Sequence, residues 1–166
     1  GRDFDRAAAF AEEQAVRTGL PVRATQQAEE AGSCDLVCTV TGSPEPILKG
    51  EWVRDGAHVN LVGAHARTTR EADSALIARG VLYVDLMESC RNEGGDFMIP
   101  LDEGVIAEEA IVGELGQLCC GEIPGRDNAG QVTIYNSLGM TAQDLFAARH
   151  VYDKARELDV GIEAQF

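Results

Sequence analysis

The stretch that decides the fold is residues 35–73, DLVCTVTGSPEPILKGEWVRDGAHVNLVGAHARTTREAD. It contains two short apolar runs, residues 35–40 and 57–62, and each run stops at small or hydroxyl residues. Apolar runs of this length that alternate with helical segments predict strands of a parallel sheet covered on both faces. Ligands bind at the carboxyl ends of such strands, and both ends here carry little side-chain bulk. The stretch therefore predicts a fold and a binding site together.

The rest of the chain continues the alternation of helix and strand, which is typical of a doubly wound α/β sheet. The expected helices are residues 4–18 (with Gly19 as the stop), 26–32, 68–79, 105–120 and 141–158, and the expected strands are residues 21–24, 81–85 and 132–135. Residues 68–71 have the spacing of a capping box, and Thr141 is the expected cap of the last helix. Residues 121–130 are rich in glycine and charge, so we expect this loop to be mobile.

One part of the expected fold has no counterpart in the sequence. A dinucleotide-binding fold begins with a strand, a G-x-G-x-x-G turn and a helix, and this chain has no such motif. We therefore expect a partial Rossmann-like, doubly wound parallel sheet that lacks the first strand–glycine loop–helix unit. Residues 1–140 would form this partial NAD(P)-binding domain. The opening Gly1-Arg2-Asp3, without a methionine, favours a fragment or an unfinished reading frame.

Composition limits the classes of partner. The 166 residues carry a net charge of -14, which would repel nucleic acid. No apolar run approaches the ~20 residues that span a bilayer, and no leader is visible, so we expect a soluble cytoplasmic protein.

No histidine pair has metal-ligand spacing, and we expect no metal. The five cysteines are an odd set without metal-site spacing, and we expect them to be buried or half-buried free thiols: Cys34, Cys38, Cys90, Cys119 and Cys120.

Short motifs in a fixed order extend from Arg2 to about Tyr152 and resemble one family. They are Thr39-Val-Thr41, Glu45-Pro-Ile-Leu48, Gly56-Ala-His-Val-Asn60, Val62-Gly-Ala64, Arg70-Glu71 with Asp73, Glu114-Leu-Gly116, and Ser137-Leu-Gly139 with Asp144. Together they resemble the ornithine cyclodeaminase/mu-crystallin family, which includes ketimine reductases and some alanine dehydrogenases. Intact members carry an additional amino-terminal substrate and dimerisation domain, so the resemblance covers their carboxyl-terminal half. It implies that the helix in residues 141–166 packs on that domain. A truncated sheet would leave a strand edge unpaired and apolar surface uncovered, so we expect the protein to be oligomeric or paired with a missing half.

The resemblance implies cofactor contacts at six residues. Arg2 matches the arginine that meets the adenosine 2′-phosphate in NADPH-using members, and NAD-using members place an acid where Gly1 stands, so NADP(H) is expected over NAD(H). The alternative is that Arg2 is an ordinary surface arginine. The other five residues are Thr41 beside the cofactor, Val62, Gly63 and Ala64 under the nicotinamide, and Ser137. Thr41 would otherwise be a plain strand cap.

His65 separates the activities within the family. True ornithine cyclodeaminases carry an acid/base aspartate at this position and a lysine four residues later, where this chain has Thr69. Reductase-like members vary here and include histidine. Beside a nicotinamide, His65 could donate a proton to an imine nitrogen after hydride delivery, since imidazole titrates near neutral pH. The alternative is a rim histidine that only shapes the pocket.

Glu114 and Leu138 match residues of the adjoining substrate pocket in the family. The Glu114 carboxylate could hold the charge of an iminium group, or it could be a solvated helix residue. Leu138 would line the pocket. Arg70, Glu71 and Asp73 are expected to fix the start of the neighbouring helix rather than to act chemically.

The first hypothesis is an NAD(P)-dependent oxidoreductase that transfers hydride to or from the C=N carbon of a small imino or amino acid. A second is ornithine cyclodeaminase, which converts ornithine to proline and ammonia, and His65 argues against it. A third is a non-catalytic, mu-crystallin-like binding or structural protein, because without the glycine loop the pyrophosphate has no backbone cradle. If the chain is the whole protein, we expect weak or no dinucleotide binding and no turnover.

Overall fold

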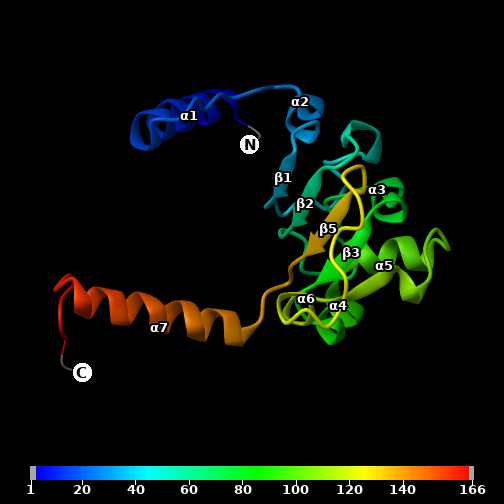
Figure 1. The fold of residues 1–166 in the computed structure, drawn as a ribbon. Helices are drawn as coiled ribbons and strands as arrows, with labels where there is room; N and C mark the ends of the chain where they lie inside the picture. The colour runs from blue at the N-terminus through cyan, green and yellow to red at the C-terminus, as the bar shows by residue number, and fades with distance from the viewer. Residues whose placement is uncertain (1–2, 165–166) are drawn as a thin grey trace.

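The computed structural model describes residues 3–164, and its centre is a five-stranded sheet in which every strand is parallel to its neighbours. The strands lie in the order β1-β2-β5-β3-β4 (Figure 1). Their bounds are Leu36–Thr39 for β1, His58–Leu61 for β2, Val81–Val84 for β3, Ile111–Glu114 for β4 and Thr133–Asn136 for β5. The parallel α/β fold predicted from the apolar runs is confirmed.

The pairing register aligns the carboxyl ends of the strands. Thr39 pairs with Leu61, Leu61 with Asn136, and Asn136 with Val84. These are the last residues of four neighbouring strands, so the segments that follow them all leave the sheet at one side. We call this side the carboxyl edge.

Helices α3 (Ser74–Arg79), α4 (Met87–Glu93) and α5 (Gly95–Asp102) pack against one another on one side of the sheet, where Figure 1 shows α3 and α5. Leu76 of α3 and Phe97 of α5 are fully buried, and they join one hydrophobic core with Val59, Leu82 and Ile134 from the central strands. Burial of this apolar face is the main stabilising term of such a domain.

The opposite face of the sheet is covered unevenly. In β1, Val37 is buried and Leu36 is 60% exposed, and in β2, Val59 is buried and His58 is half-buried. The described residues leave the second face of β1 exposed and that of β2 half-buried, so cover on both faces stays an expectation at these two strands. Over β3, the loop of residues 121–130 provides cover, and Tyr83 donates a hydrogen bond to the carbonyl oxygen of Pro124 at 2.9 Å.

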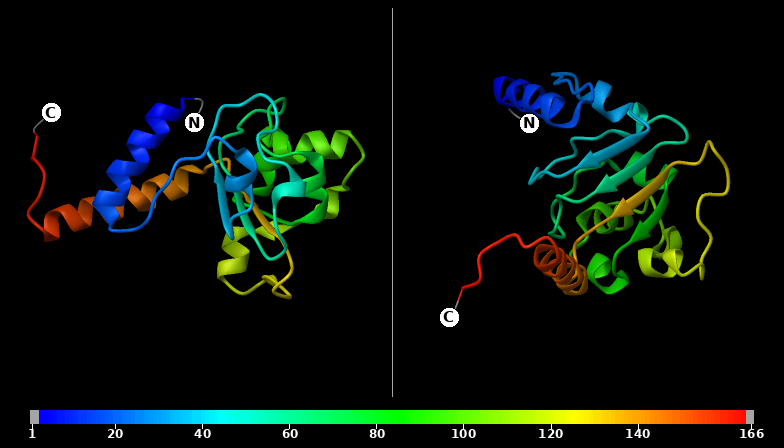
Figure 2. Two further views of the ribbon diagram at one scale, coloured as in Figure 1. Left: turned by 90° about the horizontal axis from the view of Figure 1, so that it is seen from above. Right: turned by 60° about the vertical axis from the view of Figure 1, so that its left-hand side comes forward.

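Helices α1 (Phe4–Thr18) and α7 (Thr141–Glu157) extend away from the sheet on the side opposite α3 and α5, as two views show (Figures 1 and 2). Asp3 caps α1 by accepting the Arg6 N–H, and Gly19 ends it with φ 69°, as predicted for a glycine stop. Thr141 does not cap α7: the capping position is Met140, which makes no side-chain hydrogen bond there.

Three expected elements are absent or begin at a different residue than predicted. Residues 21–24 are irregular rather than a strand, because no described strand pairs with them. The following short helix, α2, spans Ala28–Gly32. Helix α3 begins at Ser74, not at Thr68, and its cap is Asp73, which accepts the Leu76 N–H at 2.9 Å. The capping-box prediction failed because the Glu71 carbonyl accepts the Ile47 and Leu48 N–H groups, in a bridge beside Leu48 and Ala72.

Residues 105–120 are not mainly helical as expected. They contain the short 3₁₀ helix η2 (Glu108–Ala110), strand β4, and helix α6 (Leu115–Cys119). Pairing with β3 draws Ile111–Glu114 into the sheet, which overrides the local helical pattern. The other 3₁₀ helix, η1, spans Gly50–Trp52 and packs on α3.

The loop of residues 121–130, expected to be mobile, is attached to the sheet at several points. Arg126 donates to the carbonyl oxygens of Gly56 and Ala57 and, at 3.0 Å, to the hydroxyl of Thr133. The mobility of this loop stays a prediction, and the hydrogen bonds of Arg126 would restrict it. Within the described residues, no helix is both long and apolar enough to cross a bilayer.

Candidate functional site

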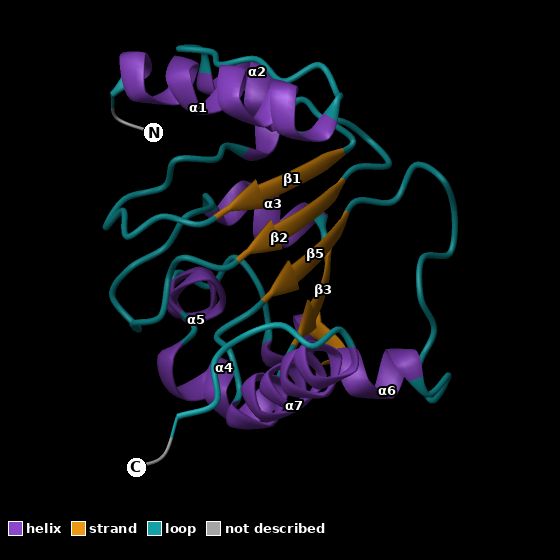
Figure 3. Cartoon of the chain, turned by 90° about the vertical axis from the view of Figure 1, so that its left-hand side faces the viewer, coloured by secondary structure: helices purple, strands orange, loops and turns teal. Residues whose placement is uncertain are grey.

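The carboxyl edge brings together the site residues predicted from separate motifs. Thr41 follows β1 by two residues, Val62 follows β2 directly, and Ser137 follows β5 directly. Strands β1, β2 and β5 lie side by side (Figure 3). Because their register is aligned, the three residues that follow them lie along one edge of the sheet. Thr41 and Val62 are exposed, as a cofactor contact would require. Arg2 lies outside the described residues.

A buried carboxylate ties the ends of β1 and β2 together. Glu71 is 0% exposed, and its Oε1 accepts the Thr41 N–H at 2.6 Å. Its Oε2 accepts the Gly63 N–H at 2.7 Å and the Thr39 hydroxyl at 2.7 Å. A buried carboxylate is tolerated only when such donors compensate for its lost hydration. Glu71 therefore fixes the two loops that carry the predicted cofactor residues, a wider role than the helix start expected from sequence.

The packing around Gly63 leaves no space for a side chain at this position. A Cβ atom built on Gly63 would meet the Thr41 carbonyl oxygen at 2.1 Å, the Thr41 nitrogen at 2.3 Å and a Glu71 carboxylate oxygen at 2.5 Å. These distances are far shorter than a real Cβ contact. The absence of a side chain at Gly63 is thus explained without a nicotinamide ring, and the predicted ring contact stays a prediction.

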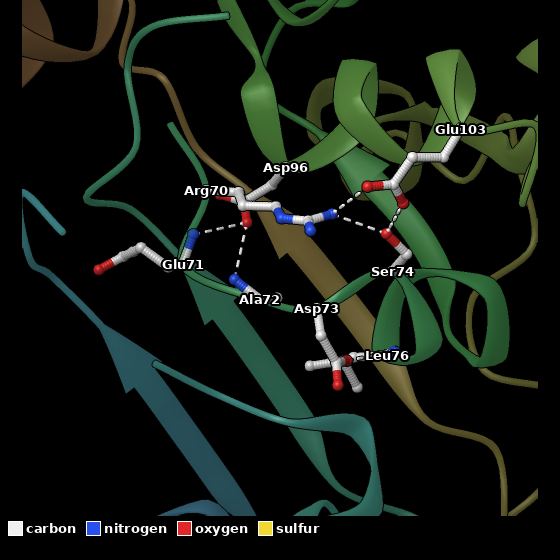
Figure 4. A network of polar contacts seen from close by, with 8 residues as sticks. All are labelled: Arg70, Glu71, Ala72, Asp73, Ser74, Leu76, Asp96 and Glu103. Atoms are coloured by element: carbon white, nitrogen blue, oxygen red, sulfur yellow. Dashed lines mark hydrogen bonds and ion pairs between the residues drawn. The ribbon is translucent and has the colours of Figure 1, made fainter. Parts of the chain in front are cut away.

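A second buried carboxylate supports Glu71 from the side of α5 (Figure 4). Asp96 is 1% exposed, and its Oδ1 accepts the backbone N–H groups of Glu71 and Ala72, both at 2.9 Å. Its Oδ2 is buried and has no hydrogen-bond partner among the described residues. Burial raises the pKa of Asp96 from 3.8 to about 6, although the two backbone hydrogen bonds oppose the shift.

A third carboxylate holds the loop after β5. Asp85, the residue after β3, is 4% exposed, and its Oδ2 accepts the Leu138 N–H at 2.8 Å, the Gly139 N–H at 2.5 Å and the Ser137 hydroxyl at 3.3 Å. The predicted cofactor residue Ser137 and the predicted pocket residue Leu138 therefore share one anchor.

Glu114 acts structurally in this conformation. Its Oε1 accepts the Met87 N–H at the start of α4 at 2.8 Å, and its own N–H donates to the Gln117 side chain in a capping box at α6. The side chain is half-buried. The predicted contact with a substrate iminium group stays a prediction.

His65 lies in the loop after β2 and is exposed. Its Nδ1 lies 3.1 Å from the carbonyl oxygen of Gly63. Ala64, between them, is buried at 3% exposure. An exposed imidazole oriented by a backbone carbonyl can exchange a proton with a ligand at the edge.

Sequence reasoning missed Asp85 and Asp96. Asp85 had a usable signal, because it directly follows a four-residue apolar strand at the end where loops are anchored. Asp96 had none, since it follows Gly94-Gly95 in a segment without a recognised motif. The ring nitrogens of His58 lie 2.8 Å from the Thr133 hydroxyl and 3.3 Å from the Asn60 side-chain oxygen.

The cysteines are free, as expected, but mostly not buried. Cys34, Cys38, Cys119 and Cys120 are exposed and only Cys90 is buried. Burial, with the charges of Asp85 and Asp96, raises the pKa of the Cys90 thiol to about 12. In residues 3–164, no group of three or more histidine, cysteine or acidic side chains is arranged to hold a metal ion.

A groove of about 1050 Å³ runs along the outer side of β1. The groove is lined by residues of α2 and the preceding loop, by residues 37–43, and by Phe4, Ile47 and Leu48. β1 is the edge strand here, so the groove borders backbone groups that no described strand pairs with. Such an edge can accept a further parallel strand.

Comparison with known proteins agrees with the fold and the motifs. The family model described as "Ornithine cyclodeaminase/mu-crystallin family" matches residues 1–159. The ketimine reductase mu-crystallin of Mus musculus is 39% identical over 153 residues, which are 92% of this chain and 46% of that protein. A Delta(1)-pyrroline-2-carboxylate reductase of Bacillus thuringiensis is 33% identical over 167 residues, 99% of this chain and 51% of that protein.

A solved structure shows the same arrangement. Thermococcus litoralis Delta(1)-pyrroline-2-carboxylate reductase, in complex with NADH and L-proline, superposes with a TM-score of 0.90 at 36% identity, over 98% of this chain and 50% of that one. An archaeal alanine dehydrogenase dimer with bound NAD gives a TM-score of 0.80 at 30% identity, over 98% and 49%. The chain spans about half the length of these relatives.

Proposed function

The chain belongs to the ornithine cyclodeaminase/mu-crystallin family, and from this premise we propose that it is the nicotinamide-dinucleotide-binding portion of an oxidoreductase. The reaction would transfer hydride to or from the C=N carbon of a small imino or amino acid. Reduction of a cyclic imino acid such as Δ1-pyrroline-2-carboxylate is the first candidate, because several relatives carry that name.

The observation that carries the proposal is the alignment of Thr41, Val62 and Ser137 along the carboxyl edge. Parallel sheets bind nucleotide cofactors at this edge. The neighbouring acids, Glu71 and Asp85, are buried beneath the loops and satisfied by backbone and hydroxyl donors, so neither presents a free carboxylate to an anionic cofactor.

The residues at this edge fit a nicotinamide ring. Val62 is 40% exposed, and a Cβ built on Gly42 would meet nothing within 4 Å, so the surface beside Thr41 is open. A bound nicotinamide supplies the hydride. Thr41 and Val62 would orient the ring, and His65 would donate the proton that the imine nitrogen takes up when the C=N bond is reduced.

The phosphate cradle and the remaining substrate contacts are proposed to lie in sequence beyond these 166 residues. A strand–glycine loop–helix unit would add its strand to the outer edge of β1, along the groove described above. Helix α7, whose Phe146 is 75% exposed, would pack on an amino-terminal dimerisation domain. The fact that the relatives are about twice as long supports both parts of the proposal.

The preference for NADP(H) rests on Arg2 and on the absence of an acidic residue at Gly1, and it stays a prediction. The related structures contain NADH or NAD. Comparing the affinities for NADPH and NADH in the parent protein and in Arg2→Ala tests it: the substitution should weaken NADPH binding and leave NADH binding unchanged. Equal losses for both cofactors would assign Arg2 no role at the 2′-phosphate. A cytoplasmic location likewise stays a prediction.

The test of the main proposal is an assay of Δ1-pyrroline-2-carboxylate reduction by the protein that carries this chain. The reaction is monitored through the decrease in the absorbance of the reduced nicotinamide. We expect turnover with NADH or NADPH and a loss of about 10²-fold or more in kcat for His65→Asn, the magnitude typical of a lost general acid. His58→Asn, the same substitution at the amino end of β2, is the matched control. Release of ammonia and proline from ornithine in the presence of NAD would instead establish the cyclodeaminase, and binding without turnover of any imino acid would favour the non-catalytic reading.

A further inference from the structure

Glu71 connects the loop that carries His65 with the loop that carries Thr41. The N–H of Gly63 donates to Glu71 Oε2 at 2.7 Å, and the carbonyl oxygen of the same residue lies 3.1 Å from His65 Nδ1. Glu71 Oε1 holds the Thr41 N–H at 2.6 Å. One fully buried carboxylate therefore reaches the candidate proton donor on one side and the candidate cofactor loop on the other.

This arrangement fixes which nitrogen of His65 carries a proton. A carbonyl oxygen can only accept, so Nδ1 must donate to Gly63 in the neutral ring. Nε2 is then the nitrogen with the lone pair, and it makes no hydrogen bond to any other described residue. Proton exchange with a ligand would take place at Nε2.

Gly63 has little freedom to move away from this position. Its side-chain direction is filled by Thr41 backbone atoms and by Glu71. Glu71 is itself held through its own N–H, which donates to Asp96 at 2.9 Å (Figure 4). Both oxygens of the Glu71 carboxylate accept hydrogen bonds, and a buried polar group that is satisfied in this way is held rigidly.

We propose that Glu71 is a positioning residue that holds Gly63, Thr41 and His65 as one unit, so that His65 presents Nε2 to the substrate beside the cofactor. The inference rests on the proposed function and names a residue on which that function depends. Glu71 itself touches neither ligand. During reduction, the imidazolium would give its Nε2 proton to the imine nitrogen, and a bound reduced nicotinamide would supply the hydride to the carbon. A neutral imidazole with its proton on Nδ1 would remain.

The test is nitrogen-15 NMR of the His65 ring, together with site-resolved amide exchange, in the protein without cofactor or substrate. In the parent protein, we expect His65 as the Nδ1-H tautomer and slow exchange at Thr41 and Gly63. In Glu71→Gln, the amide nitrogen cannot accept, so at least one of these N–H groups loses its acceptor. Exchange at the affected position should become about tenfold or more faster, and the ring should shift toward the Nε2-H tautomer.

Asp73→Asn is the matched control. Asp73 is a neighbouring carboxylate that also accepts two backbone N–H groups, those of Gly50 and Leu76, both at 2.9 Å. Its loss should weaken the α3 cap and speed exchange at Gly50 and Leu76, but leave the His65 tautomer unchanged. The proposal fails if Glu71→Gln leaves the tautomer as in the parent, or if Asp73→Asn shifts it equally.

A second variant keeps the proposal testable if Glu71→Gln does not fold. Thr39→Val removes only the hydroxyl donor to Glu71 Oε2 and leaves the N–H groups in place. We expect a smaller shift of the His65 tautomer in the same direction, and no shift would contradict the proposal. Because no cofactor or imino acid is present, these results are independent of the turnover assay: the positioning role can fail while imine reduction stands, and the reverse.

Discussion

The Oδ1 atom of Asp96, at the start of α5, accepts the backbone N–H of Glu71 at 2.9 Å, so one buried acid fixes the main chain of another. The Glu71 carboxylate then joins the ends of β1 and β2. The helical layer and the carboxyl edge are thus connected by two acids, both within 1% of full burial.

The Asp96 carboxyl makes stability depend on pH. Burial raises its folded-state pKa from 3.8 to about 6, so between these values the folded protein keeps a proton that the unfolded chain has lost. The stability from this group is full below about pH 4, decreases as the pH rises, and is lost above about pH 6. Asp96→Asn cannot titrate. Its free energy of unfolding relative to the parent should therefore rise by about 2 kcal/mol from about pH 4 to pH 7, measured by urea unfolding. A difference that stays constant with pH would contradict this.

Gly63 should tolerate no side chain. In Gly63→Ala, the added Cβ meets Thr41 backbone atoms and Glu71, so either the loop moves or the carboxylate loses its donors. We expect a loss of about 1–3 kcal/mol in the free energy of unfolding. Gly42→Ala is the control in the adjacent loop, where the added Cβ meets nothing within 4 Å, and it should change stability by less than about 0.5 kcal/mol. Equal effects in thermal unfolding would refute the explanation.

Asp85 should control the loop after β5. Asp85→Asn removes an acceptor for up to three donors, those of Ser137, Leu138 and Gly139, and we expect a loss of about 2 kcal/mol in unfolding free energy. Amide exchange at Leu138 and Gly139 should rise above that of the core strands. Ser137→Ala removes only the longest of the three bonds and should have a smaller effect; the opposite ranking would contradict the assignment.

The five thiols should fall into two classes. Cys90 is fully buried and the pKa of its thiol is raised to about 12, so the nucleophilic thiolate is scarce and inaccessible. A maleimide at neutral pH should modify the four exposed cysteines quickly and Cys90 only after unfolding, as counted by mass spectrometry. Rapid modification of all five in the folded protein would contradict the packing of α4 against the core.

Local patterns predicted the elements whose signals lie within a few residues. The apolar runs gave β1, β2, β3 and β5, and the glycine stop gave the end of α1 at Gly19. The prediction failed where a partner distant in sequence decides the conformation. Residues 111–114 join the sheet because β3 lies beside them, and residues 21–24 stay irregular because no described strand does. Helices α4 and α5 were not predicted at all.

The sequence by itself determined the parallel α/β fold, the family and the residues that follow each strand, because these depend on residue type and spacing along the chain. Only the tertiary structure decided how the carboxyl edge of the sheet is held together. Three acids, Glu71, Asp85 and Asp96, bind groups that lie 8 to 54 residues away, besides the adjacent Leu86 N–H that Asp85 accepts, and no local pattern encodes the distant contacts. A buried carboxylate must find its donors wherever the fold supplies them, so its partners become visible only when the chain is folded.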